Sequence, residues 1–229
     1  MKAEYIDHMG NDLSVVRAAK VSFANDDSVQ MFLTEAVAEA LSVEQGVKVR
    51  SHEALINYLA KHGHWTPFAH TSITLKMSAP VPIRTQCFKH KVGFVENEES
   101  RRYISDRPVL FVPKEFRLAP DGDKVKQGSA GPHPDSTALL LAYKQRCEDM
   151  IKFYEDLVKQ GVAPEQARFA LPQGCEVNWY WTGSLYAYAA AYAKRTDSHA
   201  QGEVNDLFSE IGPIMQSLFP YSWNALTGE

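Results

Sequence analysis

A long run of apolar residues at helical spacing, between Asp135 and Gln160, constrains the fold more than any other feature of the sequence. Apolar side chains that recur every three or four positions line one face of an α-helix. Asp135 occupies a favourable N-cap position, and Gly161 follows where a C-terminal cap is expected. The chain must therefore pack a long helix against other elements through its apolar face. That face comprises Leu139, Leu140, Tyr143, Cys147, Met150, Ile151, Tyr154, Leu157 and Val158.

The rest of the chain predicts a sheet and further helices. Some segments alternate apolar and polar residues, as strands do, and others carry helical spacing or helix-capping residues. The predicted strands are Lys2–Met9, Thr71–Ser78, Glu99–Ile104 and Val109–Val112. Two helices are predicted at Val29–Leu41 and Glu53–His62, and a third begins around Pro80 and Pro82. A short helix begins at Pro164 and contains Arg168, and the segment Trp179–Ala193 is predicted to be partly helical. A last helix is capped by Ser198 and Gln201 and is ended or kinked by Gly212 and Pro213.

Together these elements predict an α+β fold. We expect a single domain over residues 1–229, with a modest antiparallel or mixed sheet flanked by several helices. The segment 119–135 is rich in glycine, proline and charge. That composition is typical of a surface loop and predicts an insertion within the domain.

The composition indicates a soluble cytoplasmic protein. Of the 229 residues, 45% are hydrophobic and 23% are charged, which is ordinary for a globular domain. The net charge of -4 argues against a general nucleic-acid-binding protein, since such proteins are usually basic. The three cysteines are widely spaced, so we expect reduced thiols and neither disulfides nor a zinc site. No signal-like segment or bilayer-length apolar stretch is present, so no membrane association is expected.

The densest polar cluster is the segment Gln86–Tyr103. It opens with Lys89, His90 and Lys91, continues through several acidic residues, and ends in the run Ser100–Arg102. Closely grouped donors and positive charges suit a phosphate group, and glutamine, serine and arginine side chains can hydrogen-bond a pyrimidine edge. The simpler interpretation is a solvated charged loop.

Three histidines, His62, His64 and His70, lie close together in the sequence. Such a group allows a metal-dependent hydrolase as an alternative function. However, no HExxH pattern is present, and Pro67 interrupts any helical register between the histidines. We therefore expect no metal site here, but a loop that turns into the following strand.

Two further arginines lie in settings that suit an anion. Arg168 lies among apolar residues, where a charged side chain usually has a partner. Arg195 precedes a predicted helix N-terminus, which favours bound anions. A surface ion pair is the alternative for Arg195. These clusters together predict a pocket for a phosphorylated ligand.

The segment KHKVGFVENEESRRY resembles the signature RHRxxSxNExSxRY of flavin-dependent thymidylate synthases. The blocks GHWTPFAH, ARFALP, WYWT and RTDSHAQ also look like blocks of that family, in the expected order. Lys89 and Lys91 stand where the signature has arginines, which keeps the charge but loses the bidentate fork. One extra residue also separates Lys91 from Asn97, so a non-catalytic nucleotide-binding protein on the same fold is an alternative. The matching residues are His90, Asn97, Glu98, Ser100, Arg102 and Tyr103.

The resemblance implies the fold of that family and an enzyme that methylates dUMP to dTMP. In this family NADPH reduces FAD, methylenetetrahydrofolate donates the one-carbon unit, and no cysteine attacks the uracil. The resemblance also implies a homotetramer with FAD held between subunits.

Positions that match the family's blocks imply the site residues. Arg102 is expected to pair with the dUMP phosphate, and Arg168 and Arg195 are expected to contact or polarise the pyrimidine. Ser100 is a binding hydroxyl near the base, and it joins Arg168 and Arg195 as an implied catalytic residue. The implied dUMP-binding set is Gln86, Glu98, Ser100, Arg102, Arg168 and Arg195. The implied FAD-binding set is His64, Lys89, His90, Lys91, Ser184 and His199.

Overall fold

The computed structural model describes residues 1–22, 31–46, 48–104, 106–120, 128–197 and 200–228. Its centre is a four-stranded sheet in the order β1-β2-β4-β3, in which every neighbouring pair is antiparallel. Of the two sheet types predicted, the antiparallel one is therefore confirmed. The strands are β1 (Lys2–Met9), β2 (Ser72–Pro80), β3 (Phe94–Glu98) and β4 (Glu176–Gly183).

Two of the predicted strands are confirmed and two are wrong. Lys2–Met9 is β1, and Thr71–Ser78 corresponds to β2. The predicted strand Glu99–Ile104 is a turn, and Val109–Val112 contributes only the isolated bridge between Leu110 and Cys175. The third strand of the chain lies instead inside the charged segment, at β3. Its charged residues concealed it, because the half-buried Glu96 and Glu98 pair with Lys91 and Arg84, which lie outside the strand.

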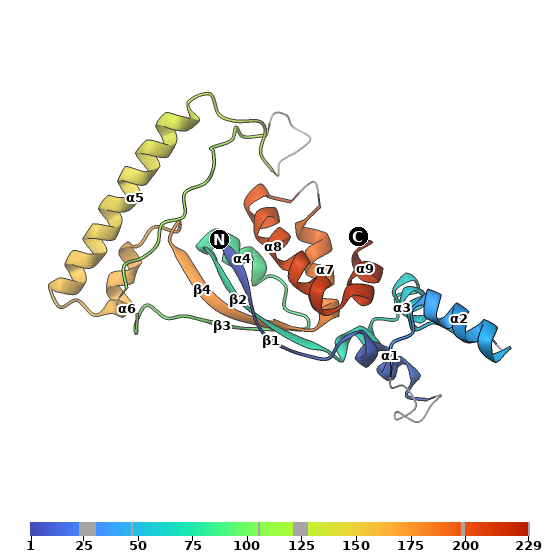
Figure 1. The fold of residues 1–229 in the computed structure, drawn as a ribbon. Coiled ribbons are helices and arrows are strands. Elements are labelled where there is room, and N and C mark those ends of the chain that lie inside the picture. The colour runs from blue at the N-terminus through green and yellow to red at the C-terminus, as the bar shows by residue number, and fades with distance from the viewer. Residues whose placement is uncertain (23–30, 47, 105, 121–127, 198–199, 229) are drawn as a thin grey trace.

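Helices surround the sheet on one face and at both ends (Figure 1). α4, α7, α8 and α9 cover one face, α1 to α3 lie at one end, and α5 and α6 lie at the other (Figure 1). The α-helices are α1 (Asp12–Lys20), α2 (Glu35–Gln45), α3 (His52–Lys61), α4 (Val81–Cys87), α5 (Ser136–Lys159), α6 (Pro164–Ala167), α7 (Leu185–Arg195), α8 (Gly202–Leu218) and α9 (Pro220–Thr227). Short 3-10 turns form η2 (Thr66–Ala69) and η3 (Arg168–Ala170).

Several predicted helix boundaries need correction. Of the helix predicted over Val29–Leu41, the first two residues lie outside the described part of the chain. The helix α2 begins at Glu35, where the Thr34 side chain caps it by accepting a hydrogen bond from the Val37 amide at 3.3 Å. Pro213 does not end α8, which continues to Leu218. The buried face of α8 packs on the sheet, and this packing outweighs the local cost of an internal proline.

The predicted partly helical segment Trp179–Ala193 is split between two elements. Its first part is the strand end Trp179–Gly183, and its second part lies in α7. Ser184 separates them and caps α7 by accepting a hydrogen bond from the Ala187 amide at 3.2 Å. For the next helix, Gln201 is the N-cap residue of α8, while Ser198 lies outside the described residues.

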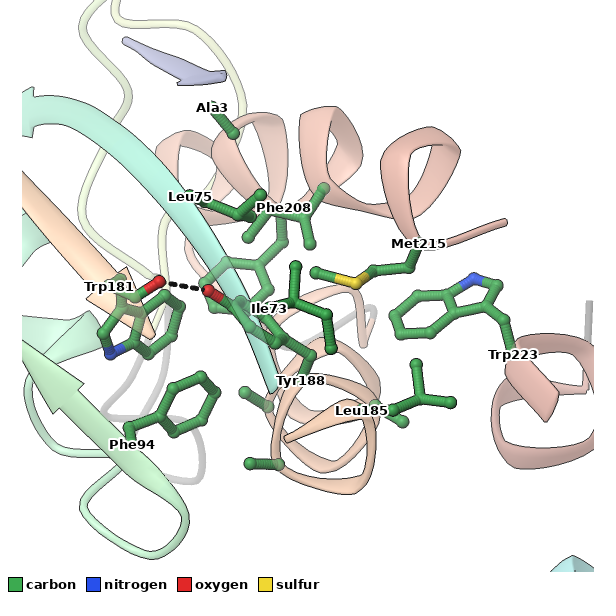
Figure 2. Packing of buried hydrophobic residues seen from close by; sticks show 14 of the residues in the cluster. Ala3, Ile73, Leu75, Phe94, Trp181, Leu185, Tyr188, Phe208, Met215 and Trp223 are labelled. Atoms are coloured by element: carbon green, nitrogen blue, oxygen red, sulfur yellow. Dashed lines mark hydrogen bonds between the residues drawn. The ribbon is translucent and has the colours of Figure 1, made fainter. Parts of the chain in front are cut away.

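The core lies between the sheet and the covering helices. Trp181 stacks on Phe94 with ring centroids 4.0 Å apart, and the Tyr188 hydroxyl donates to the Trp181 carbonyl at 2.6 Å (Figure 2). These aromatic residues join β3, β4 and α7, and α8 packs against them through Phe208. Burial of one such side chain contributes roughly 2–3 kcal/mol. The core therefore fixes the ends of β3 and α7, which carry the polar residues described below.

The long helix α5 is confirmed from Ser136 to Lys159. It projects away from the sheet (Figure 1) and buries only Cys147, Ile151 and Tyr154 of its predicted apolar face. Other apolar side chains on it, including Met150 and Phe153, are exposed. Much of its apolar surface is therefore uncovered within this chain.

The predicted loop 119–135 is described only at its base. The Arg117 and Pro132 backbones form an antiparallel bridge, and the Leu118 amide donates to the Gly131 carbonyl at 2.9 Å. Residues 121–127 lie outside the described part of the chain. That this segment is an insertion within one domain stays a prediction.

Candidate functional site

Arg195, the last residue of α7, forms one network with two other predicted site residues, His90 and Gln86. Its Nε donates to His90 Nε2 at 2.9 Å. Its two terminal nitrogens donate to the Gln86 side-chain carbonyl at 3.4 Å and to the Gln86 backbone carbonyl at 3.1 Å. Gln86 lies at the end of α4, and His90 lies in the loop that follows. The guanidinium is half-buried, so these acceptors hold it in a fixed direction.

The ring of His90 is an acceptor in this network. Burial, together with the charges of Arg195 and Lys194, lowers the pKa of His90 to about 4. The imidazole is therefore neutral at pH 7, and its Nε2 lone pair receives the Arg195 N–H. A protonated His90 would place two cations in contact, so the geometry and the charge state agree.

Glu98, at the end of β3, lies in a second charged group. Its Oε2 is 2.7 Å from Arg84 Nε of α4, and the two side chains are 29% and 24% exposed. Burial raises the pKa of Glu98, and the charges of Arg84 and Arg168 offset part of this rise. Arg84 also lies over the Phe88 ring, 5.1 Å from its centroid. Glu98 therefore lies within the electrostatic reach of Arg84 and of Arg168, a second predicted nucleotide-binding residue.

The turn after β3 carries the remaining predicted nucleotide residues. The Tyr103 amide donates to the Ser100 carbonyl at 2.9 Å and closes this turn. Arg102 Nε donates to Ser100 Oγ at 3.3 Å, and its guanidinium lies 5.3 Å from the Tyr103 ring centroid. Arg102 and Tyr103 are exposed to solvent. These contacts are local and leave the arginine free to turn toward a ligand.

Arg168 is also exposed. Its Nε donates to the Glu165 carbonyl at 3.2 Å. The residue begins η3 and does not lie inside the preceding helix α6, so its predicted place within that helix is wrong. Its guanidinium therefore lies at the surface near Glu98.

The predicted setting of Arg195 is also wrong. Arg195 ends α7 and does not lie directly before a helix N-terminus, because the N-cap residue of the next helix is Gln201.

A cavity of about 690 Å³ opens where β3, β4 and α7 meet. Trp65 and Tyr186 line it with rings 5.8 Å apart, and both side chains are partly exposed. Gly93 has a φ of +79°, and a Cβ there would lie 2.9 Å from the Ala187 Cβ. A larger residue at this position would therefore push the strand and helix apart and change the cavity. Ser184 lines the same cavity at the start of α7.

The other predicted flavin residues lie in different places. His64 is exposed beside Tyr58, with ring centroids 6.1 Å apart. Lys89 is exposed, and Lys91 pairs with Glu96 and lies 5.4 Å from the Phe88 ring centroid. His199 lies outside the described residues. Among the predicted flavin residues that the structure describes, only His90 lies in the Arg195 network.

The residues present fit a flavin. Open aromatic and apolar walls beside hydroxyl groups suit a planar ring that carries polar edges. Lys91 immediately precedes the cavity residues Val92 and Gly93, and a lysine can accompany a pyrophosphate as a point charge. Trp65, Tyr186 and Ser184 would therefore meet the ring system, and Lys89 and Lys91 would meet the phosphates.

The histidines of the alternative hydrolase do not form a site in the structure. His62, His64 and His70 are all exposed. Among the described residues, no group of histidine, cysteine and carboxylate side chains has an arrangement that could hold a metal ion.

Two residues that sequence reasoning missed, Arg84 and Gln201, take part in the site. Arg84 pairs with Glu98, and Gln201 accepts a hydrogen bond from Gln86 at 2.6 Å. Arg84 belongs to no motif that indicates a ligand, and Gln201, although it ends the block RTDSHAQ, was predicted only to cap a helix. Their partners lie far away in the sequence, so only the folded chain brings them together.

Comparisons with known proteins agree with the geometry. A family model described as thymidylate synthase complementing protein matches residues 4–221. The flavin-dependent thymidylate synthase of Thermosipho africanus (strain TCF52B) is 30% identical over 221 residues, covering 96% of this chain and 88% of that protein. The corresponding enzyme of Anaplasma marginale (strain St. Maries) is 32% identical over 219 residues, covering 94% and 68%.

A solved structure has the same fold. It is the UMP/dUMP methylase PolB from Streptomyces cacaoi bound with 5-Br dUMP, with a TM-score of 0.81, 26% identity, and coverage of 99% of this chain and 94% of that one. Within the described part of the chain, no helix is both long and apolar enough to cross a bilayer. The match extends over nearly the whole sequence and includes the fold, so this chain belongs to the family of flavin-dependent thymidylate synthases.

Proposed function

We propose that this chain catalyses the reductive methylation of dUMP to dTMP. Methylenetetrahydrofolate supplies the one-carbon unit, and NADPH is the final reductant. When bound, FAD carries the hydride that turns the transferred carbon into a methyl group. The observation that carries the proposal is the Arg195 network, in which a half-buried guanidinium is aimed by Gln86 and His90 in a chain of this family.

The protein's own contribution is to position charge around the nucleotide. Arg195 and Arg168 contact or polarise the pyrimidine and favour electron density at the carbon that receives the methyl group. Arg102 pairs with the phosphate, and Ser100 donates its hydroxyl near the base. Glu98 and Gln86 complete the nucleotide site.

A second set of residues holds the flavin. The backbone and side chains around the cavity of about 690 Å³ receive the ring, with Ser184 at its edge. His64, Lys89, His90, Lys91 and His199 complete this set.

We further propose that the active form is a homotetramer in the cytoplasm, with no nucleic-acid partner and with FAD between subunits. The uncovered apolar surface of α5, which includes Met150 and Phe153, supports an assembly of copies. The segment Tyr186–Tyr192 contributes less to such a surface, because Ala187, Tyr188 and Ala191 are buried in the core.

A visible absorption titration with FAD, with and without dUMP, tests the proposal. We expect a saturable flavin band that dUMP perturbs, followed by formation of dTMP when methylenetetrahydrofolate and NADPH are added. FAD and dUMP binding without turnover would instead favour the non-catalytic nucleotide-binding protein. Stoichiometric zinc or manganese without any flavin binding would favour the hydrolase.

A further inference from the structure

A chain of hydrogen bonds runs from Arg195 to an ion pair on α8. Gln86 Nε2 donates to Gln201 Oε1 at 2.6 Å, and Gln201 Nε2 donates to Glu203 Oε2 at 2.9 Å. Glu203 also accepts two hydrogen bonds from Arg117 Nη2, at 2.7 Å on Oε1 and at 2.8 Å on Oε2. Gln86, Gln201 and Glu203 therefore link Arg195 to Arg117, which lies at the base of the loop 119–135.

Arg195 and Glu203, at the two ends of this series of hydrogen bonds, fix which group donates and which accepts in each bond. A guanidinium can only donate, so the oxygen of the Gln86 amide faces Arg195. Its NH₂ group then faces Gln201, which must present its own oxygen. The Gln201 NH₂ group points to Glu203, and an ionised carboxylate can only accept. Each amide thus has one favourable orientation.

Glu203 is well suited to hold the far end. Its side chain is 14% exposed and that of Arg117 is 26% exposed, so solvent screens the pair only in part. Burial by itself raises the pKa of Glu203, but the hydrogen bonds from Arg117 and Gln201 outweigh it and leave the pKa lowered. The carboxylate therefore stays ionised at pH 7.

Packing fixes Arg117 as well. Its Nε donates to Ser129 Oγ at 2.7 Å, across the base of the loop. Gly202 lies directly against it, because a Cβ on that glycine would be 3.2 Å from Arg117 Nη1. Gln86, Arg195 and Gln201 meet at a cavity of about 540 Å³, so the chain of bonds ends at space that a ligand can enter.

We propose that Glu203, held by Arg117, is a positioning residue that sets the amide of Gln201 and, through it, the amide of Gln86. The inference rests on the proposed function, because Gln86 is part of the proposed nucleotide site. When the Glu203 carboxylate is absent, the side-chain amide of Gln201 can flip. Its NH₂ group then faces the NH₂ group of Gln86, and the hydrogen bond between the two amides is lost. The Gln86 carbonyl then no longer faces Arg195 in a single orientation, and nucleotide binding weakens.

The test compares Glu203→Gln with a matched control on the same helix. Asp206 pairs with Lys114 at 2.9 Å, about one turn along α8, but it has no bond to Gln201. We expect Glu203→Gln to raise the KM and the Kd for dUMP about tenfold, which corresponds to one hydrogen bond, with kcat changed less than about twofold. Asp206→Asn should leave both values unchanged.

A second variant keeps the inference testable if the loss of the ion pair unfolds the protein. Gln201 is exposed, and Gln201→Leu interrupts the chain while leaving Arg117 and Glu203 paired. It should raise the Kd for dUMP by a similar factor, with an unchanged Tm and unchanged FAD affinity. Wild-type affinity for dUMP in Gln201→Leu or in a folded Glu203→Gln would overturn the inference. A wild-type protein that binds no dUMP would instead refute the proposed function.

Discussion

The two arginine regions of the candidate site differ in how they are held. Arg195 is half-buried, and it donates three hydrogen bonds, two to Gln86 on α4 and one to His90 in the loop that follows α4. Arg168 and Arg102 are exposed, and within the described part of the chain their side chains donate hydrogen bonds only to residues within three positions in the sequence. One region is set before any ligand arrives, whereas the other is an open surface.

This difference assigns different energetic roles to similar side chains. A fixed, partly desolvated guanidinium interacts strongly with developing charge and needs little reorganisation. An exposed guanidinium is screened by water and loses side-chain entropy when a ligand orders it. We therefore expect Arg195 to affect the chemical step most, and the exposed arginines to act mainly in capturing the nucleotide.

Arg195→Ala is the strongest test of this comparison. It removes the preset guanidinium and leaves the Gln86 carbonyl and the His90 ring without their donor. A loss of roughly 3–4 kcal/mol, or on the order of 10²–10³ in kcat/KM for dUMP, is expected. Steady-state kinetics with Arg195→Lys as the control would check it, since lysine keeps the charge but not the forked geometry. Full activity of both variants would remove the distinction between the two regions.

Arg168→Ala should have a smaller effect. Because this side chain is exposed, its removal is expected to weaken dUMP-dependent turnover by about 30-fold, or roughly 2 kcal/mol, with no change in Tm. The flavin band should persist, because the inferred role is at the nucleotide. Glu165→Ala is a suitable control, since Arg168 contacts only the backbone carbonyl of Glu165. Unchanged turnover in Arg168→Ala would end its assignment to the site.

The helical parts of the fold follow from local sequence patterns more closely than β3 does. The periodic apolar face of α5 and its flanking Asp135 and Gly161 mark both helix ends to within a residue. β3 was missed because its alternation includes Glu96 and Glu98, whose partners are Lys91 and the distant Arg84. Burial of a charge in a strand depends on such a partner, and a single segment of sequence does not reveal it.

The candidate site shows the same contrast between residues that local patterns indicate and residues that only the fold brings together. The resemblance to the family brought out Arg195, His90 and Gln86, and the structure joins these residues in one network. The bond between Gln86 and Gln201 spans 115 positions, and no local pattern indicates it. Motifs therefore predict which residues contact ligands, whereas the contacts that orient these residues, such as that between Gln86 and Gln201, emerge only in the folded chain.

The stability of the fold should depend on pH through the charge state of His90 in the Arg195 network. The folded-state pKa of His90 is about 4, below its ordinary value of 6.5. Between these values the unfolded chain binds a proton at His90 and the folded chain does not, so stability falls as the pH is lowered from 6.5 toward 4. His90→Gln, which keeps an acceptor for Arg195, should reduce this loss by on the order of 1 kcal/mol, because the half-buried ring is partly screened. Urea unfolding at pH 6.5 and pH 4.5 measures it, and equal losses in both proteins would contradict the assigned charge state.

The smallest effect is expected for the cysteines, although Cys87 ends α4 and lies within reach of the Arg195 charge. Burial raises the pKa of Cys87 to about 12 and that of Cys175 to about 11, and it also raises the pKa of Cys147. The nearby charge of Arg195 lowers the pKa of Cys87 only in part. At pH 8 all three are neutral thiols, which are poor nucleophiles.

Replacement of all three by alanine should therefore change turnover by less than about twofold. It should lower stability by about 1 kcal/mol for each buried thiol. Single-turnover formation of dTMP by the folded, flavin-loaded variant measures the chemical step separately from that loss. If this variant formed no dTMP, a thiol would be essential to the chemistry, and Cys87, beside Arg195, would become the residue to explain.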